Sequence, residues 1–111
     1  MYYILDELNE PVRVENAFDW SNKFNEKMRR VALDEVNGVS ISTVFLGIDH
    51  SFGSGKPLLW ETMCFSHNLD YDQYQERYTS YKDTVEGHKQ CVDSITKNEP
   101  LNYRKTIKLK I

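Results

Sequence analysis

The sequence predicts a single α+β domain, an antiparallel meander sheet with two helices packed on one face. Alternating apolar and polar residues, typical of strands, occur in the segments around residues 30–48 and 58–65. Residues 17–28 and 81–96 instead carry apolar side chains at steps of three and four, as amphipathic helices do. A chain of 111 residues is long enough for one core and too short for two.

The N-terminal residues predict a small hairpin and a first helix. Residues 2–5 and 12–14 form its arms, and Asn16 is a suitable N-cap for a helix ending near Met28. One face of that helix carries Ala17, Trp20, Phe24 and Met28. We interpret this stripe as packing surface; an aromatic ligand box is the alternative.

The clearest hairpin joins residues 29–36 to residues 39–48. Asn37-Gly38 suits a type I′ turn, in which both central residues have positive φ. A two-residue loop pairs Val36 with Val39, Ala32 with Thr43 and Arg30 with Phe45. We expect the core face to carry Val31, Leu33, Val44, Leu46 and Ile48. The other face would carry Arg30, Ala32, Asp34, Ile41, Thr43, Phe45 and Gly47, a mixture that predicts contact with another subunit or a ligand.

Residues 58–65 and 73–78 are expected to continue the meander. Leu59, Met63 and Phe65 suit the core, whereas Trp60, Thr62 and Cys64 point the other way. Glu61 shares the parity of the first set and therefore needs a cation partner or a place near the strand end. Ser80 with Asp83 resembles a capping box and predicts a helix over residues 81–96, which Pro100 stops.

Charge and composition limit the partners. The net charge of −3 makes nucleic acid an unlikely partner, and no apolar run is long enough to span a membrane. Residues 1–100, the predicted domain, hold 10 basic and 17 acidic residues, whereas the strand-like extension 101–111 holds four basic and none acidic. We expect this basic extension to dock on a sheet edge of its own chain or of a neighbour, as part of a homo-oligomer.

The loop after residue 48 holds the densest set of reactive side chains. Asp49 and His50 leave a strand and enter a loop with Gly53 and Gly55, a favoured setting for binding groups. The plainer interpretation is that Asp49 caps the loop and His50 lies on the surface. Asp49 and His50 with Glu61 or His88 could bind a metal, but no close-spaced ligand motif supports this, and we predict neither metal nor cofactor. Residues 50–57 lack the glycine and Ser/Thr positions of a P-loop.

Three further side chains complete the predicted site. His88 lies on the apolar stripe of the second helix, where most histidines are hydrogen-bonded core residues, and Gly87 beside it permits close helix–sheet approach. Arg30 and Arg77 could pair with Glu61 or Asp34, or bind a phosphate through two hydrogen bonds. The expected ligand-binding residues are Arg30, Phe45, Asp49, His50, Phe52, Glu61, Arg77 and His88.

Residues 42–65 resemble a small protein family that is widespread in bacteriophages and prophages. The shared features are Ser-Thr-Val-Phe-Leu-Gly at 42–47, Asp49-His50, Phe52-Gly53, Pro57-Leu58-Leu59, Glu61-Thr62-Met63 and Phe65, with Arg77-Tyr78-Thr79 and Gly87-His88 beyond them. The resemblance covers about residues 1–97. It implies a phage setting and a fold, but no activity.

Two functional classes follow, with a third beside them. We favour a non-catalytic binding protein that sequesters a small anionic or nucleotide-like host signalling molecule and so blunts antiphage defence. The alternatives are a small hydrolase using Asp49, His50, Glu61 or His88, and an interaction module for a host protein. Two cysteines in no redox motif, with no signal peptide at the N-terminus, predict reduced thiols in the bacterial host cytoplasm.

Overall fold

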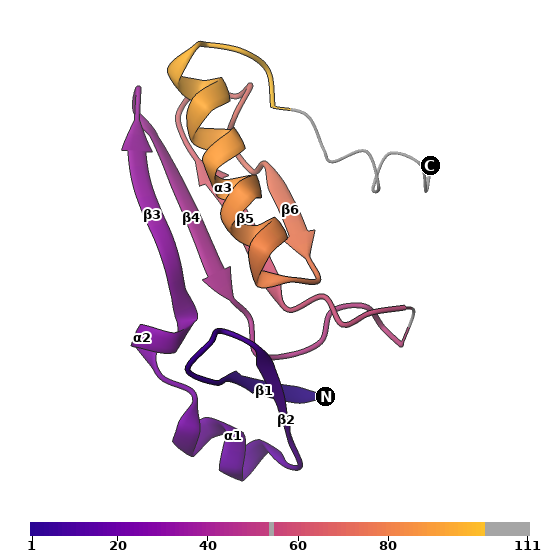
Figure 1. Ribbon diagram of the computed structural model, residues 1–111. Helices are drawn as coiled ribbons and strands as arrows, with labels where there is room; N and C mark the ends of the chain where they lie inside the picture. Colours follow the sequence, from indigo (N-terminus) through magenta and orange to yellow (C-terminus); the bar gives the residue numbers. More distant parts are fainter. Residues whose placement is uncertain (54, 102–111) are drawn as a thin grey trace.

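The computed structural model describes residues 1–53 and 55–101. A four-stranded antiparallel sheet in the order β3-β4-β5-β6 lies at its centre. The strands are Arg30–Val36, Val39–Phe45, Trp60–Phe65 and Gln75–Tyr78, and the long helix α3, Tyr81–Thr96, crosses one face (Figure 1). The predicted α+β class is confirmed. Apart from Leu101, the predicted extension lies outside the described residues, so its docking stays a prediction.

The N-terminal hairpin is a separate two-stranded sheet. It lies at the end of the main sheet where β4 leads into the loop before β5, called the loop end here. It consists of β1, Tyr2–Leu5, and β2, Pro11–Val14, as predicted. The backbone N–H of Tyr3 donates to the carbonyl of Gly47 at 2.7 Å, and the Trp20 indole donates to the carbonyl of Tyr3 at 2.9 Å. This connection ends β4 at Phe45, three residues earlier than the sequence predicted.

The first predicted helix is two short helices, α1 (Ala17–Lys23) and α2 (Glu26–Arg29). Asn16 caps α1 as expected, and its side chain accepts from the Asp19 N–H at 2.9 Å. The prediction of one continuous helix is wrong because Asn25 adopts an extended conformation and caps a new helix, accepting from the Met28 N–H at 2.8 Å. Phe24 and Met28 still pack against the core, together with Val31 and Tyr3.

The register of β3 against β4 contains one irregularity. Val36 pairs with Val39 and Ala32 with Thr43, as predicted, and Asn37 and Gly38 have the positive φ of a type I′ turn. Between Arg30 and Ala32 the register shifts, so that Arg30 pairs with Val44 and not with Phe45. This β-bulge leaves Val31 to pack against the core and turns Arg30 to the opposite face.

The predicted assignment of the sheet faces is wrong. The side chains of Ile41, Thr43, Phe45, Trp60, Thr62 and Cys64 are all fully buried on the face that α3 covers. Leu33 and Phe65, predicted as core, are 50% and 47% exposed on the other face. The threonine hydroxyls made the α3 face resemble a surface, although they hydrogen-bond to one another inside the protein. The face predicted to meet a second subunit is therefore covered within one chain.

The core has two apolar clusters with polar side chains between them. One, under the C-terminal half of α3, consists of Val39, Ile41, Cys64, Tyr71, Cys91 and Ile95. The other, at the loop end, consists of Phe45, Leu59, Trp60 and Tyr78. In the residues that the structure describes, no helix is long and apolar enough to cross a membrane.

Candidate functional site

A chain of hydrogen-bonded side chains crosses the space between the two apolar clusters. Tyr78 of β6 donates to Thr62 of β5 at 3.0 Å, and the hydroxyls of Thr62 and Thr43 lie 2.6 Å apart. Thr43 lies 2.6 Å from Nδ1 of His88, whose Nε2 lies 2.7 Å from the Asp34 carboxylate. One side chain from each strand of the main sheet, β3 to β6, and one from α3 are thereby joined.

The donors fix the direction of this chain. A hydroxyl donates only one hydrogen. The Asp34 carboxylate only accepts, so Nε2 of His88 carries a hydrogen, and in the neutral imidazole Nδ1 accepts the hydrogen of Thr43. The Thr43 oxygen then accepts from Thr62, which accepts from Tyr78. His88 is left with its hydrogen on Nε2, where it donates to Asp34. The sequence-based interpretation of His88 as a hydrogen-bonded core residue fits this arrangement, although the predicted partners were Glu61 and Asp49.

The Asp34 end of the chain opens into a groove between β3 and α3. Asp34 is 51% exposed, whereas the His88 side chain is only 8% exposed. The groove has a volume of about 370 Å³. It is lined by Val31, Ala32 and Asp34 from β3 and by Tyr81, Val85, His88, Lys89 and Val92 from α3. Its lining is mainly apolar, with the polar groups of Asp34, His88 and Lys89 and the Tyr81 hydroxyl among the apolar side chains.

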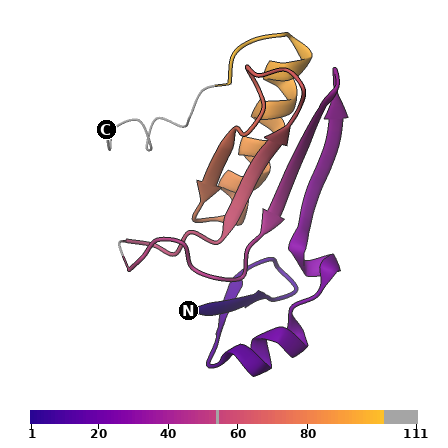
Figure 2. The same ribbon diagram turned by 180° about the vertical axis from the view of Figure 1, so that it is seen from behind.

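Two features leave this groove open. Ala32 has a small side chain opposite the helix, and Val85, on the facing turn of α3, is 46% exposed. On the outer side, β3 is an edge strand that pairs only with β4 among the described strands (Figure 2). The backbone groups on its second edge therefore hydrogen-bond to no other strand of that part of the chain.

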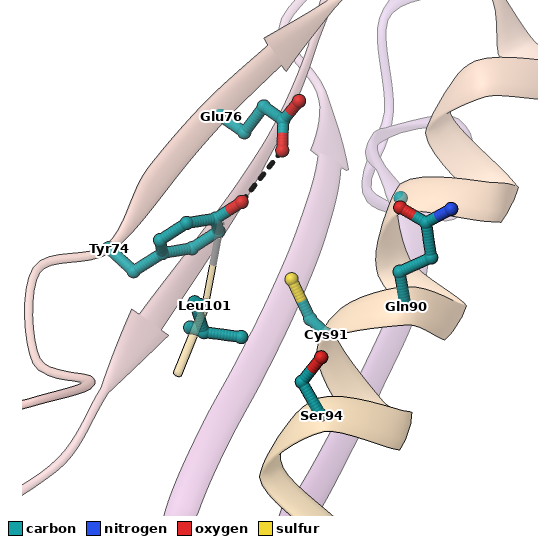
Figure 3. A pocket seen from close by; sticks show the side chains of 7 residues that line it. Tyr74, Glu76, Gln90, Cys91, Ser94 and Leu101 are labelled. Atoms are coloured by element: carbon teal, nitrogen blue, oxygen red, sulfur yellow. Dashed lines mark hydrogen bonds between the residues drawn. The ribbon is translucent and has the colours of Figure 1, made fainter. Parts of the chain in front are cut away.

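A smaller cavity of about 220 Å³ lies on the other side of α3. Figure 3 shows Tyr74 and Glu76 on its strand wall and Gln90, Cys91 and Ser94 on α3, with Leu101 closing one side. The Tyr74 hydroxyl donates to the Glu76 carboxylate at 2.7 Å. Burial and this hydrogen bond raise the pKa of Tyr74 well above its ordinary value, so the phenol stays protonated.

Cys64 and Cys91 are free thiols that meet in the core under α3. A hydrogen bond from the Cys91 thiol lowers the pKa of Cys64, and the same bond together with burial raises the pKa of Cys91. Both residues are almost completely buried. We assign them a packing role.

Asp49 closes its own loop, as the plainer interpretation proposed. One carboxylate oxygen accepts from the N–H groups of Ser51 and Leu58, at 2.8 and 3.0 Å, and the other accepts from the Ser51 hydroxyl at 2.9 Å. Burial raises the pKa of Asp49, but these hydrogen bonds outweigh burial and hold the pKa below its ordinary value. The carboxylate is thus committed to the structure.

The other predicted site residues do not converge around Asp49. Nδ1 of His50 lies 2.7 Å from the carbonyl of Ile48, and Phe52 is 91% exposed at the loop tip. Arg30 pairs with Glu26 at 3.4 Å on a different element. Phe45 is fully buried in the core and cannot contact a ligand there.

Glu61 has the cation partner that its position required. Its carboxylate pairs with Arg77 at 2.9 Å and also accepts from the Gln75 amide. Both residues lie on the sheet face opposite His88. Cross-strand partners share a face, and Glu61 pairs with Val44 and Arg77, whereas Thr43, which contacts His88, pairs with Thr62. The predicted cluster of Asp49, His50, Glu61 and Arg30 is therefore not assembled.

The described residues contain no group of three or more His, Cys, Asp or Glu side chains that could hold a metal ion. Comparisons with family models, curated protein sequences and solved structures found no match. The assignment of a site therefore depends on the geometry of the chain itself.

The groove was missed because its two walls were assigned to different surfaces: the α3 stripe and Val31 to the core, and Ala32 and Asp34 to a face that meets another subunit or a ligand. Tyr81, Val85 and Val92 form the stripe that predicted α3, and only part of that stripe reaches the core. One signal could have revealed the groove: the apolar stripe of α3 is long, and the edge strand beside it carries the small side chain of Ala32, which leaves space between them. His88 is the one predicted site residue that lines it.

Loss of one hydroxyl should break the buried chain. Thr43→Val leaves Nδ1 of His88 without a donor and should lower the free energy of unfolding by about 1–3 kcal/mol. Thr62→Val should also destabilise, and the double variant should cost less than the sum by about 1 kcal/mol, because the two hydroxyls act on each other. Urea denaturation of the four proteins measures this coupling.

Thr96→Val is the matched control, since its hydroxyl donates only to Val92 at the end of α3. It should add independently to Thr43→Val. Full additivity between Thr43→Val and Thr62→Val would show that the chain contributes nothing as a unit.

Proposed function

We propose that the protein is a non-catalytic binding module that takes an extended peptide segment of a partner protein into the groove between β3 and α3. The observation that carries the proposal is an apolar groove beside an edge strand whose outer hydrogen-bonding groups pair with no described strand. Peptide recognition by strand addition uses this combination of an open edge and a lined groove.

An extended peptide matches both parts of the groove. Its backbone would pair with the outer edge of β3, and every second side chain would point toward α3. Val31, Ala32, Val85 and Val92 favour apolar side chains at those positions. The residues between them would point away from α3, where Glu35 on that face of β3 and the acidic balance of residues 1–100 favour basic side chains.

The buried chain supports binding over catalysis. Asp34, His88 and Thr43 are hydrogen-bonded in the order acid, imidazole, hydroxyl, as in a nucleophilic triad. Thr43, however, is fully buried and also hydrogen-bonded to Thr62. A hydroxyl that no substrate can reach does not act as a nucleophile, so we assign the chain to holding α3 in place.

The setting of the proposal comes from the sequence. The resemblance of residues 42–65 to a phage family supports a role in an infected bacterium, where the partner would be a protein of the host cytoplasm involved in antiphage defence. We also propose that the protein associates with itself. The sheet face opposite α3 supports this, because among the described residues Leu33 and Phe65 are about half exposed there, and exposed apolar side chains favour contact with another surface.

A carboxylate in the groove should abolish peptide binding. Peptides selected from a displayed random library on the immobilised protein should alternate apolar and basic residues, and Val85→Asp should weaken their binding at least about tenfold in fluorescence anisotropy. Val12→Asp is the matched control, because Val12 lies on β2 and is 44% exposed, close to the 46% of Val85.

Backbone methylation of the selected peptide separates strand addition from simple apolar contact. Methyl groups on the N–H groups that face β3 should remove binding, whereas methyl groups on the alternate positions should be tolerated. Equal effects at both sets, or equal loss in Val12→Asp and Val85→Asp, would contradict the proposal.

Binding of a small anionic or nucleotide-like molecule is a second candidate, favoured by one observation. Arg30, Val44, Glu61 and Arg77 lie in one row across the face opposite α3. The two arginines are three strand spacings apart, about 14 Å, a span that a nucleotide can cover but a single phosphate cannot. Both side chains are partly exposed there.

Titration calorimetry with ATP tests this candidate. Arg77→Gln should reduce the affinity by about tenfold, since hydrogen bonds to a charged group contribute about 1.5–3 kcal/mol. Arg13→Gln, an exposed arginine on β2, should leave it unchanged. Absence of measurable heat, or equal loss in the two variants, would refute nucleotide binding on this face.

A further inference from the structure

The uncovered face of the main sheet has an ordered pattern of charge. Figure 2 views the sheet from the side opposite α3; the short helix α2, which also contacts β3 and β4, lies at the end where β3 begins. Cross-strand pairing arranges the outward side chains of this face in three rows. The first row is Arg30, Val44, Glu61 and Arg77; the second is Leu33, Ser42, Met63 and Gln75; the third is Glu35, Ser40 and Phe65.

Charge changes sign from one end of this face to the other. The first row has two arginines and one glutamate; that glutamate is paired with Arg77, and Arg30 shares the carboxylate of Glu26 on α2 with Arg29. The third row has one acidic side chain, Glu35, which accepts from the Ser40 hydroxyl at 2.6 Å. The middle row is uncharged, with Leu33 half exposed and Met63 half buried.

A surface with opposite charges at its two ends is complementary to itself. A two-fold axis along the middle row would reverse the strands, so that the first row of each copy meets the third row of the other. Arg30 of one copy would then face Glu35 of the second, and Phe65 would lie over the Glu61–Arg77 pair. A two-fold axis parallel to the strands would instead place Arg30 of one copy opposite Arg77 of the other. Repulsion between these like charges disfavours that arrangement.

We propose that a second copy of this chain occupies the uncovered face, with antiparallel strands and reciprocal Arg30–Glu35 contacts across the two-fold axis. The inference rests on the self-association proposed above and adds its surface and orientation. Leu33 and Met63 meet their own counterparts at the centre, and Arg77 lies against the Phe65 ring of the other copy, a cation–π geometry.

The size of the face sets the strength of the dimer. Four strands about 4.8 Å apart, averaging about six residues that rise about 3.4 Å each, make a face of roughly 400 Å². Stable interfaces bury about 800 Å² on each partner. The face is about half of that size, so we expect a weak dimer whose association must be followed to high protein concentration.

A charge exchange tests the orientation by sedimentation equilibrium of the full chain between about 5 and 500 µM. Arg30→Glu and Glu35→Arg should each weaken the dimer at least about tenfold, since each opposes like charges at two symmetric contacts. The double variant should restore wild-type association to within about threefold. Arg29→Glu is the control, because Arg29 also pairs with Glu26 but lies on α2.

The outcomes separate the surface from the association itself. A wild-type protein that is monomeric throughout the concentration range overturns both proposals. A dimer that neither single exchange weakens, or that the double variant fails to restore while its circular dichroism stays native, overturns this face and orientation and leaves self-association standing. Weakening by Arg29→Glu equal to that by Arg30→Glu would place the effect on α2 and also overturn the proposed contact.

Discussion

The seat of α3 on the sheet depends on a close contact between Gly87 and Tyr78. A Cβ atom at position 87 would collide with the Tyr78 ring and hydroxyl, so only glycine lets the helix approach β6 so closely. Because α3 lies so close to the sheet at Gly87, the next residue, His88, reaches Thr43. The hydrogen bond between Thr43 and Thr62 then connects the helix to the strands. Position and register of the helix follow from these two features together.

Everything outside the core follows from which face α3 covers. The helix lies over Ile41, Thr43, Trp60 and Thr62 and leaves the rows of Arg30, Leu33 and Glu35 uncovered. Its own apolar stripe is wider than the strip of core beneath it, and the surplus becomes the groove beside β3. Two outer surfaces with different chemistry result: the groove, proposed to bind an extended peptide, and the sheet face opposite α3, proposed to bind a second copy of the chain.

Local signals in the sequence were reliable, and the choice of face was not. Asn16, Asn37-Gly38 and Ser80 act through their nearest neighbours, so the first cap, the type I′ turn and the limits of α3 could be predicted. Which sheet face forms the core depends on partners that are distant in the sequence. The hydroxyls of Thr43 and Thr62 can be buried because His88 and Tyr78 hydrogen-bond to them, and the sequence alone does not show these contacts. The bulge at Val31 likewise changes which side of the sheet carries Arg30. The predicted site residues do not come together for the same reason, since Glu61 and His88 lie on opposite faces.

The tautomer of His88 tests this account most directly. In the hydrogen-bonded chain Nδ1 accepts from Thr43 and Nε2 donates to Asp34. Long-range ¹H–¹⁵N correlation spectra at mildly alkaline pH, where a free imidazole is neutral, assign the hydrogen to one ring nitrogen. The account predicts the Nε2–H tautomer, together with a Thr43 hydroxyl proton that exchanges slowly with water. An Nδ1–H tautomer, or a ring averaging between both forms, would contradict the seating of α3 on which both proposed surfaces depend.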